Sequence, residues 1–400
     1  MTAEKHLATA LTACLALAAP AKAQQLDLLL PDDSVPGYGR KFSVIAEHRN
    51  LAPGATGWEW NGVTLAPQLG IATGYDSAPN GAAGSTLFNA SPSLLVSDPV
   101  AGFGAYAEVN TSRYPQDVSQ NTVTAALAGG ERIELPREVI TIAAAYLRGA
   151  ETGFNVDTPV LTHPLVFTLT DLRASDEISS GMFTLKPEID AGFYSFPDMP
   201  ELNRRDMHEA LTLSYAPDGP LRYVMRLHAT QSDYKANYLT ARTNEILAGV
   251  EDKADGLWTL SLLAGAAQRH SRDISVAAPV LEARLDWLPT QRDKVQLAVL
   301  REIDDPDEIS ATPYRLTEAK LSLEHSLLEN VIVNGVAKVS NVAYMKGNSR
   351  ETLVAASLEM GWYLTPNLAL NGSYEFNNRQ ANYVSAASEH VVTMGLEWMP

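Results

Sequence analysis

The 400-residue chain contains a single cysteine, Cys14, which lies near its N-terminus. The rest of the chain can therefore form no disulfide and has no thiol for catalysis or metal binding. No run of 18 apolar residues exists outside the N-terminus, which excludes an ordinary transmembrane helix. Basic residues are also scarce: 30 Lys and Arg stand against 47 Asp and Glu, and the net charge of −17 argues against a nucleic acid partner.

The sequence is equally poor in motifs for chemistry. Its eight histidines are scattered, and none has a metal-ligand spacing such as His-x3-His. It contains no phosphate-binding glycine loop and no cofactor motif. We therefore expect no metal, no cofactor and no catalytic residue.

The N-terminal residues predict export. Lys5 precedes an apolar run from Leu7 to Pro20, and Ala21-Lys22-Ala23 follows it. This is the pattern of a signal peptide, so we predict that residues 1–23 are removed after Ala23. A lipidated Cys14 is the weaker alternative, because the apolar run continues well past it.

From Gly62 onward, apolar residues alternate with small or polar ones. Segment 183–193 is the clearest case: Phe183, Leu185 and Ile189 fall on one face, and Lys186 and Glu188 fall on the other. This period of two is typical of β-strands, whose successive side chains point to opposite faces.

Eighteen such segments follow one another, with sixteen as the alternative count. A membrane barrel presents its apolar faces to lipid and its polar faces to a lumen. We therefore predict an all-β, antiparallel transmembrane β-barrel over residues 62–400. Residues 24–61 have no strong periodicity and are expected to form a periplasmic lead-in segment. A soluble sandwich or propeller, in which the apolar faces meet each other, remains a minor alternative.

The connections between segments alternate in length. Short ones, such as Pro217-Asp218-Gly219-Pro220 and Thr365-Pro366-Asn367, carry turn residues. Longer polar ones lie between them, for example 151–163 and 377–389. Short periplasmic turns and longer outer loops are typical of outer-membrane barrels. Two connections on the short side, around 129–137 and 174–181, are expected to be unusually long.

Tryptophan gives an independent indication of a membrane. If the first strand rises from the periplasm, four tryptophans fall at periplasmic strand ends, where amphipathic rings anchor a protein at the membrane interface. These predicted anchors are Trp258, Trp287, Trp362 and Trp398. One feature opposes regular strands: four prolines lie inside them, at 67, 92, 187 and 279, which predicts bulges or locally open pairing.

The polar faces supply charges of both signs, which we predict to line the pore. They could form opposed bands that orient solutes or pair as salt bridges, and we favour pairing slightly. The pore-lining candidates are Glu108, Lys186, Glu188, Asp190, Arg222, Arg226, Arg242, Arg284, Lys294, Glu302, Lys338, Glu359 and Glu375.

Two patterns invite an enzymatic interpretation. His270-Ser271 and His325-Ser326 suggest a hydrolase, but adjacent strand residues point apart and cannot form a serine–histidine pair. Carboxylates two or four positions apart, such as Glu188 and Asp190, can serve acid–base catalysis. A solvated lumen wall explains them better.

Two stretches resemble a known family. Gly62–Leu69, running into Gly74–Ser77, looks like the first strand and loop of the outer-membrane β-barrel porins of Gram-negative bacteria. Trp287–Thr290 followed by Val295–Ile303 looks like their turn-and-strand signature. The resemblance covers residues 40–400. That family is often associated with exopolysaccharide export, so the resemblance implies a polysaccharide partner.

The sequence thus predicts an outer-membrane barrel that forms a water-filled pore for hydrophilic solutes or a polymer. Its expected partners are outer-membrane lipid, the barrel assembly machinery and a polysaccharide. A non-conducting structural barrel and an outer-membrane lipid-acting hydrolase are the alternatives.

Overall fold

The computed structural model describes residues 35–38, 57–98, 100–156, 162–217, 219–236, 240–252, 257–272, 274–304, 313–346 and 348–400. The predicted signal peptide and most of the predicted lead-in segment lie outside these residues. Within them, none of the helices is long and apolar enough to cross a membrane. The helical pieces described are the short 3-10 turns η1 (Pro79–Gly81), η2 (Val118–Gln120) and η3 (Pro200–Leu202).

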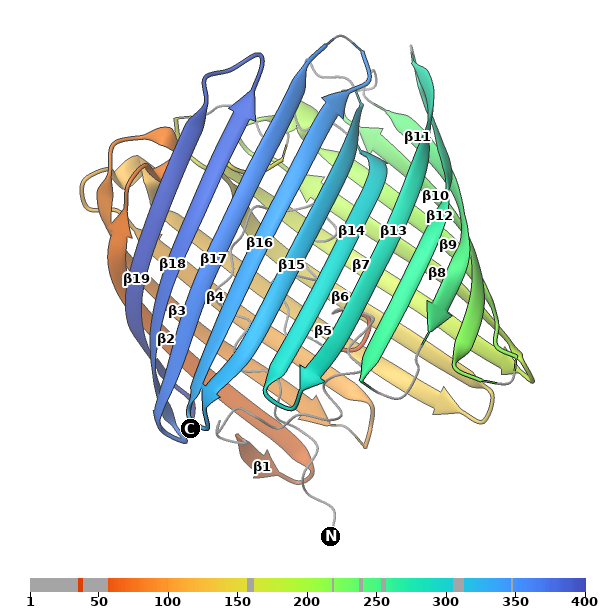
Figure 1. Cartoon of the computed structure of the whole chain (residues 1–400), viewed down its shortest axis with the longest axis horizontal. Coiled ribbons are helices and arrows are strands. Elements are labelled where there is room, and N and C mark those ends of the chain that lie inside the picture. Colours follow the sequence, from red (N-terminus) through yellow and green to blue (C-terminus); the bar gives the residue numbers. More distant parts are fainter. Residues whose placement is uncertain are drawn as a thin grey trace.

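A single antiparallel sheet closes on itself to form the molecule (Figure 1). Its strands are β1 (Trp58–Trp60), β2 (Val63–Asp76), β3 (Ser85–Asp98), β4 (Phe103–Arg113), β5 (Thr122–Leu135), β6 (Glu138–Glu151), β7 (Leu165–Ser180), β8 (Phe183–Ser195), β9 (Arg204–Tyr215), β10 (Leu221–Tyr234), β11 (Ala241–Asp252), β12 (Trp258–Ser271), β13 (Ser275–Thr290), β14 (Asp293–Asp304), β15 (Tyr314–Leu328), β16 (Val331–Tyr344), β17 (Arg350–Thr365), β18 (Leu368–Ala381) and β19 (Ala387–Trp398).

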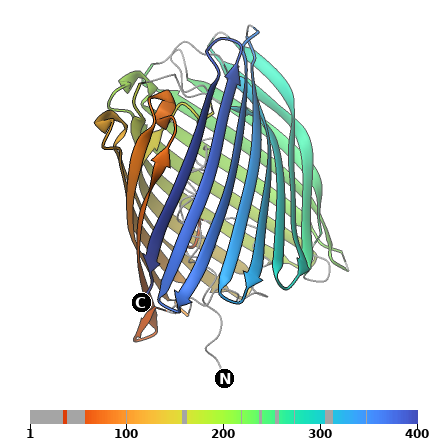
Figure 2. The same ribbon diagram turned by 60° about the vertical axis from the view of Figure 1, so that its left-hand side comes forward.

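Eighteen strands, β2 to β19, make the ring, and each pairs with its neighbours in sequence. The ring closes where β19 pairs with β2, from Leu69 opposite Trp398 to Asp76 opposite Val391 (Figure 2). β1 lies outside the ring and pairs only with the start of β2. The predicted eighteen-stranded barrel is confirmed, and the closed ring excludes two packed sheets.

The two ends of the barrel differ in their connections. At the end that holds the C-terminus and β1, strands are joined by short turns, two residues long at 136–137, 181–182, 291–292, 329–330 and 366–367 (Figure 1). At the opposite end the connections run from three residues (272–274) to thirteen (152–164). The two unusually long connections predicted on the short side are wrong, because β5 continues to Leu135 and β7 to Ser180.

Apolar side chains face outward along the strands. On β19 the outward residues Val392, Met394, Leu396 and Trp398 are 42–62% exposed, and the residues between them face the lumen. A belt of exposed apolar side chains is the outer surface expected of a barrel in lipid. Trp258 pairs directly with Trp287 at the short-turn end, where Trp362 and Trp398 also lie. Their role as interface anchors stays a prediction.

The four in-strand prolines lie where the hydrogen-bonded ladder is interrupted. Among the described strands, each is paired with one neighbouring strand and has no pair on the other. The register of the β3–β4 and β7–β8 ladders is the same before and after the gap, so no residue is inserted. Locally open pairing, one of the two predicted solutions, therefore accommodates the missing donors.

A charged side chain lies within the apolar belt near the middle of a strand. Glu209 faces outward near the middle of β9, opposite Ile189 of β8 and Ala229 of β10. Because a carboxylate in hydrocarbon is unfavourable, we expect Glu209→Leu to raise the free energy of unfolding by about 1–2 kcal/mol. Urea titration in lipid vesicles measures it. Glu138→Leu, on the same outward face but at a strand end, is the control; an equal gain there would contradict burial in lipid as the cause.

Candidate pore and the segment inside it

A short N-terminal segment, Val35–Tyr38, lies inside the barrel against the inner wall of β5–β8. Val35 is fully buried and Tyr38 is 4% exposed, and both belong to one buried apolar cluster with Tyr106 of β4 and wall residues such as Ala143 and Leu169. The lead-in segment was expected to lie in the periplasm. Residues 35–38 lie in the lumen instead, where the wall offers them both an apolar seat and a polar partner, whereas β1 lies outside the ring.

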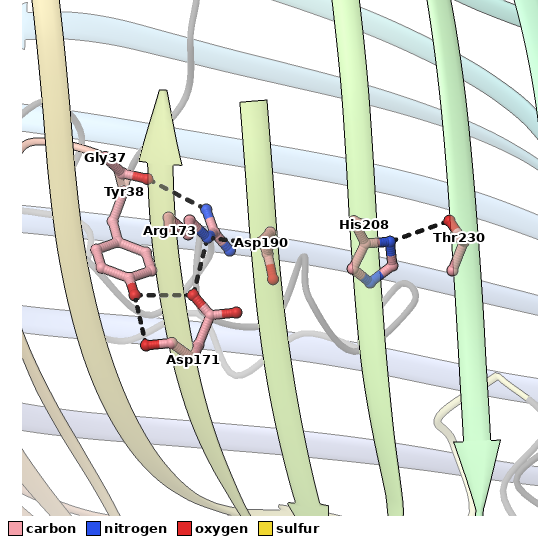
Figure 3. Close-up of polar contacts among 7 residues, drawn as sticks. All are labelled: Gly37, Tyr38, Asp171, Arg173, Asp190, His208 and Thr230. Atoms are coloured by element: carbon pink, nitrogen blue, oxygen red, sulfur yellow. Dashed lines mark hydrogen bonds and ion pairs between the residues drawn. The ribbon is translucent and has the colours of Figure 1, made fainter. Parts of the chain in front are cut away.

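The polar partner is an ion-pair cluster on β7 and β8 (Figure 3). The Tyr38 hydroxyl donates to Asp171 Oδ1 at 2.8 Å, and the Arg173 guanidinium lies over the Tyr38 ring, 4.5 Å from its centre. Arg173 also donates to the Gly37 carbonyl at 3.3 Å. The same guanidinium Nε lies 2.9 Å from Asp171 and 3.1 Å from Asp190.

The electrostatics of this cluster keep Tyr38 neutral. Burial, and then the charge of Asp171, raise the pKa of the Tyr38 hydroxyl far above its ordinary value. The phenol therefore remains a hydrogen-bond donor to Asp171 through neutral and alkaline pH. Two groups of the wall, Asp171 and Arg173, thus hold the segment, and the Tyr38 hydroxyl keeps its proton in this contact.

Two glycines make room for the segment. Gly37 has φ = +84°, a conformation that L side chains rarely adopt, and a Cβ there would overlap Ala143. On the wall, a Cβ at Gly130 of β5 would overlap the carbonyl oxygen of Pro36. The segment and its seat fit closely enough that neither position has space for a methyl group.

Ion pairs line the rest of the wall from β8 to β16. Lys186 lies 3.0 Å from Glu188 on β8, and Arg226 of β10 reaches Glu282 of β13 at 2.8 Å. Further pairs are Arg204–Asp206 at 2.8 Å, Arg284–Asp286 at 3.1 Å and Lys338–Glu318 at 3.7 Å. The carboxylates that suggested acid–base catalysis are engaged with cations. Of the two arrangements considered, the salt-bridged one accounts for this half of the wall.

The other half of the wall has a different character. In the described part of the chain, every Lys and Arg on an inward strand face lies on β7–β16 except Arg132 and Arg379. Arg132 is at the short-turn end of β5, and Arg379 is held by Glu351 near the opposite end of β18. The inner faces of β2–β6 and β17–β19 therefore carry carboxylates, amides and hydroxyls with little positive charge between.

Residues 223–398, from β10 to β19, match the model of a family described as putative beta-barrel porin 2. This match confirms the resemblance predicted from the sequence. The chain is an outer-membrane porin-like barrel. No curated relative matches it.

Solved structures similar to the barrel include two outer-membrane proteins of Pseudomonas aeruginosa. OpdK is 9% identical, with 84% of this chain and 99% of that chain covered and a TM-score of 0.47. OccK2 in complex with glucuronate is 9% identical, with 84% and 98% covered and a TM-score of 0.46. A bacterial polysaccharide outer membrane secretin is 7% identical, with 84% and 97% covered and a TM-score of 0.38. None of these similarities identifies a solute for the porin-like barrel.

The register places the predicted pore-lining residues of the porin-like barrel. Arg242 lies on the outward face of β11 together with Ile246, whereas Glu245 lies on the inward face. The predicted place of Arg242 in the lumen is therefore wrong. The other twelve lie on inward faces, and their function in a pore stays a prediction: Glu108, Lys186, Glu188, Asp190, Arg222, Arg226, Arg284, Lys294, Glu302, Lys338, Glu359 and Glu375.

The two histidine–serine neighbours point to opposite faces, as strand geometry requires. His270 faces outward and contacts Ser275 across its hairpin at 3.0 Å, while Ser271 donates to the Ile274 carbonyl. His325 faces outward and lies 2.7 Å from Asp293. Groups of three or more side chains able to hold a metal ion do not occur among the described residues.

Sequence reasoning missed several residues of the lumen. Tyr38, Asp171 and Arg173 are not among the predicted pore-lining residues, nor are Asp76, Glu389 and Glu397, which share the inner wall with Glu375. All of these except Tyr38 lie on the polar face of their strands, so the alternation of polar and apolar residues could have identified them. Tyr38 carries no local signal, because its partner Asp171 is 133 residues away in the sequence.

Proposed function

We infer that the chain forms a water-filled pore through which hydrophilic solutes cross the outer membrane. The observation that carries this proposal is the closed ring of eighteen strands with a charged and polar inner wall. Rings of this size enclose a channel unless a segment of the chain fills it. Passage of a polysaccharide is the finer form of the proposal, supported by the family resemblance and by the hydroxyl- and amide-rich wall.

A non-conducting structural barrel is the second candidate. The seated segment Val35–Tyr38 favours it, because chain inside the lumen narrows the path. The two candidates agree on the fold and differ only in the free cross-section that remains.

Planar-bilayer recording distinguishes these two functions. We expect the purified barrel, shown to be folded by its heat-modifiable gel migration, to give stepwise currents. The recording uses KCl at about 1 M, so that salt screens the charges of the wall. The same preparation after boiling is the control. Folded protein that inserts but gives no current would overturn the pore and favour the structural barrel.

Export and insertion complete this proposal. Cleavage after Ala23 and delivery by the barrel assembly machinery stay predictions from the sequence. A mature N-terminus at Gln24, read by mass spectrometry of protein purified from outer membranes, would support the first.

A further inference from the structure

A cavity of about 370 Å³ lies in the lumen on the side of β2–β6 and β17–β19. Its lining contains no Lys or Arg among the described residues. It contains six carboxylates, which come from five strands: Asp76, Glu108, Glu359, Glu375, Glu389 and Glu397. Amide and hydroxyl side chains such as Asn371, Ser373 and Thr393 fill the spaces between them.

Neutral donors, rather than cations, hold these carboxylates in place. Asn377 donates through one amide nitrogen to Glu375 at 2.8 Å and to Glu389 at 3.0 Å. Asn371 donates to Glu397 at 2.8 Å, and Tyr106 donates to Glu108 at 3.1 Å. Each bond fixes the direction of a carboxylate and leaves its charge uncompensated. The cavity therefore has a wall of carboxylates with no cation among its lining residues.

Four amide oxygens of the same lining have no hydrogen-bond donor within the described chain. Gln120 is 2% exposed; its amide nitrogen donates to the Thr162 carbonyl at 2.7 Å, while its oxygen has no partner. Asn377 is 5% exposed and likewise keeps an unpartnered oxygen. The side-chain oxygens of Asn89 and Asn110 also have no hydrogen-bond partner. A buried acceptor without a donor is unfavourable, so these oxygens point to a guest that brings hydrogen-bond donors.

An ammonium group matches this lining best. It has three donors, no acceptor and a positive charge, so it forms the strong, charge-assisted bonds that carboxylates favour. Hydroxyl groups supply further donors for the amide oxygens. A single metal ion does not match, since described carboxylates do not gather into a metal-binding group. An extended solute with several donors spans the distributed acceptors better.

We propose that this cavity binds a hydroxyl-rich solute that carries a protonated primary amine, such as an amino sugar. The proposal rests on the proposed pore function only for the route by which the solute arrives. The cavity selects for positive charge and donors, and it disfavours anions because its wall has no cation to receive them. The opposite wall, with its paired charges, has no such preference.

Binding is measured directly by calorimetry on detergent-solubilised full-length protein, with glucosamine, N-acetylglucosamine and glucose as probes at neutral pH. We expect glucosamine to bind roughly tenfold more tightly than the two neutral sugars, because it alone offers a charge-assisted bond. Glu359→Gln and Glu375→Gln each keep the shape of the side chain and are expected to lose most of that advantage. Glu188→Gln, on the salt-bridged wall, is the matched control and is expected to leave glucosamine binding unchanged.

Reversal potentials across a KCl gradient provide the second measurement. We expect the barrel to prefer K⁺ over Cl⁻ and the Glu359→Gln variant to reduce that preference. Equal affinity for the three sugars, or an equal loss in Glu188→Gln, would overturn the proposed site even if the barrel conducts. Preferred binding of glucosamine by a barrel that gives no current would overturn the pore and leave the site intact.

Discussion

Gly130→Val is expected to displace the segment Val35–Tyr38 and to raise single-channel conductance. A side chain at this position would overlap the carbonyl oxygen of Pro36, a backbone atom that cannot rotate away. Overpacking of this kind destabilises a structure by about 1–3 kcal/mol, and here it destabilises only the state in which the segment lies against the wall. Since about 1.4 kcal/mol is a tenfold change in population, a mostly seated segment becomes substantially released.

The neighbouring glycine provides a matched control. Gly129 faces the opposite side of β5 from Gly130, and a Cβ there would meet nothing closer than Ala105 Cβ at 3.9 Å. Gly129→Val therefore adds the same atoms to the same strand without touching the segment. A conductance increase in Gly129→Val as large as that in Gly130→Val would show that the change acts on the strand and not on the segment.

A gentler variant tests the same contact from the other side. Tyr38→Phe keeps the ring under Arg173 and removes the hydroxyl that donates to Asp171. A hydrogen bond to a charged group contributes about 1.5–3 kcal/mol, so we expect more frequent open events rather than complete release. Unchanged open probability in Tyr38→Phe would mean that the apolar contacts of Val35 alone hold the segment.

Arg379→Met is expected to have the largest effect on stability. Arg379 Nη2 lies 2.9 Å from Glu351, and the two side chains are 4% and 0% exposed. Arg379 also donates to the Gly153 carbonyl at 2.8 Å, which ties β18 to the loop after β6. Removing the cation leaves a buried carboxylate without compensation, at a cost of about 3–5 kcal/mol. The midpoint of urea unfolding in vesicles measures this loss.

A second inward arginine shows what burial contributes. Arg132 pairs with Glu134 at 3.0 Å, but their side chains are 54% and 70% exposed, so Arg132→Met is expected to cost less than about 1 kcal/mol. The double variant Arg379→Met with Glu351→Leu removes both buried charges and is expected to recover most of the stability. Failure of the double variant to recover would assign the loss to the Gly153 contact.

Much of the fold could be predicted from the sequence because one solvent touches each face of a strand. Hydrocarbon outside and water inside impose strict alternation, and segment 183–193 shows it without exception. The prediction was wrong where polar residues reach the strand ends. Arg132 and Glu134 look like a loop in the sequence, but they continue β5 at the short-turn end, where both sides of the sheet are exposed.

Arg242 illustrates a second limit. Its charge suggested the lumen, whereas its parity with Ile246 and Val250 assigns it to the outward face. It lies one residue from the start of β11, where a long side chain can reach beyond hydrocarbon. Near strand ends, parity is therefore a better guide than charge.

The inserted segment could not be predicted from the sequence. Val35–Tyr38 has no periodicity, and its seat is assembled from strands distant in the sequence; Asp171, for example, is 133 residues beyond Tyr38. The acidic cavity falls between these cases. The sequence alternation shows that each carboxylate faces inward. That they lie around one cavity depends on the pairing of β19 with β2, which the sequence does not show.

That closure has a consequence for biogenesis. The seam between β19 and β2 joins eight residue pairs, whereas β18 and β19 share twelve. Until β19 pairs with β2, the sheet stays open and has two edges of unpaired backbone groups, which can pair with other chains. A variant without β19 is therefore expected to aggregate rather than to form a smaller barrel.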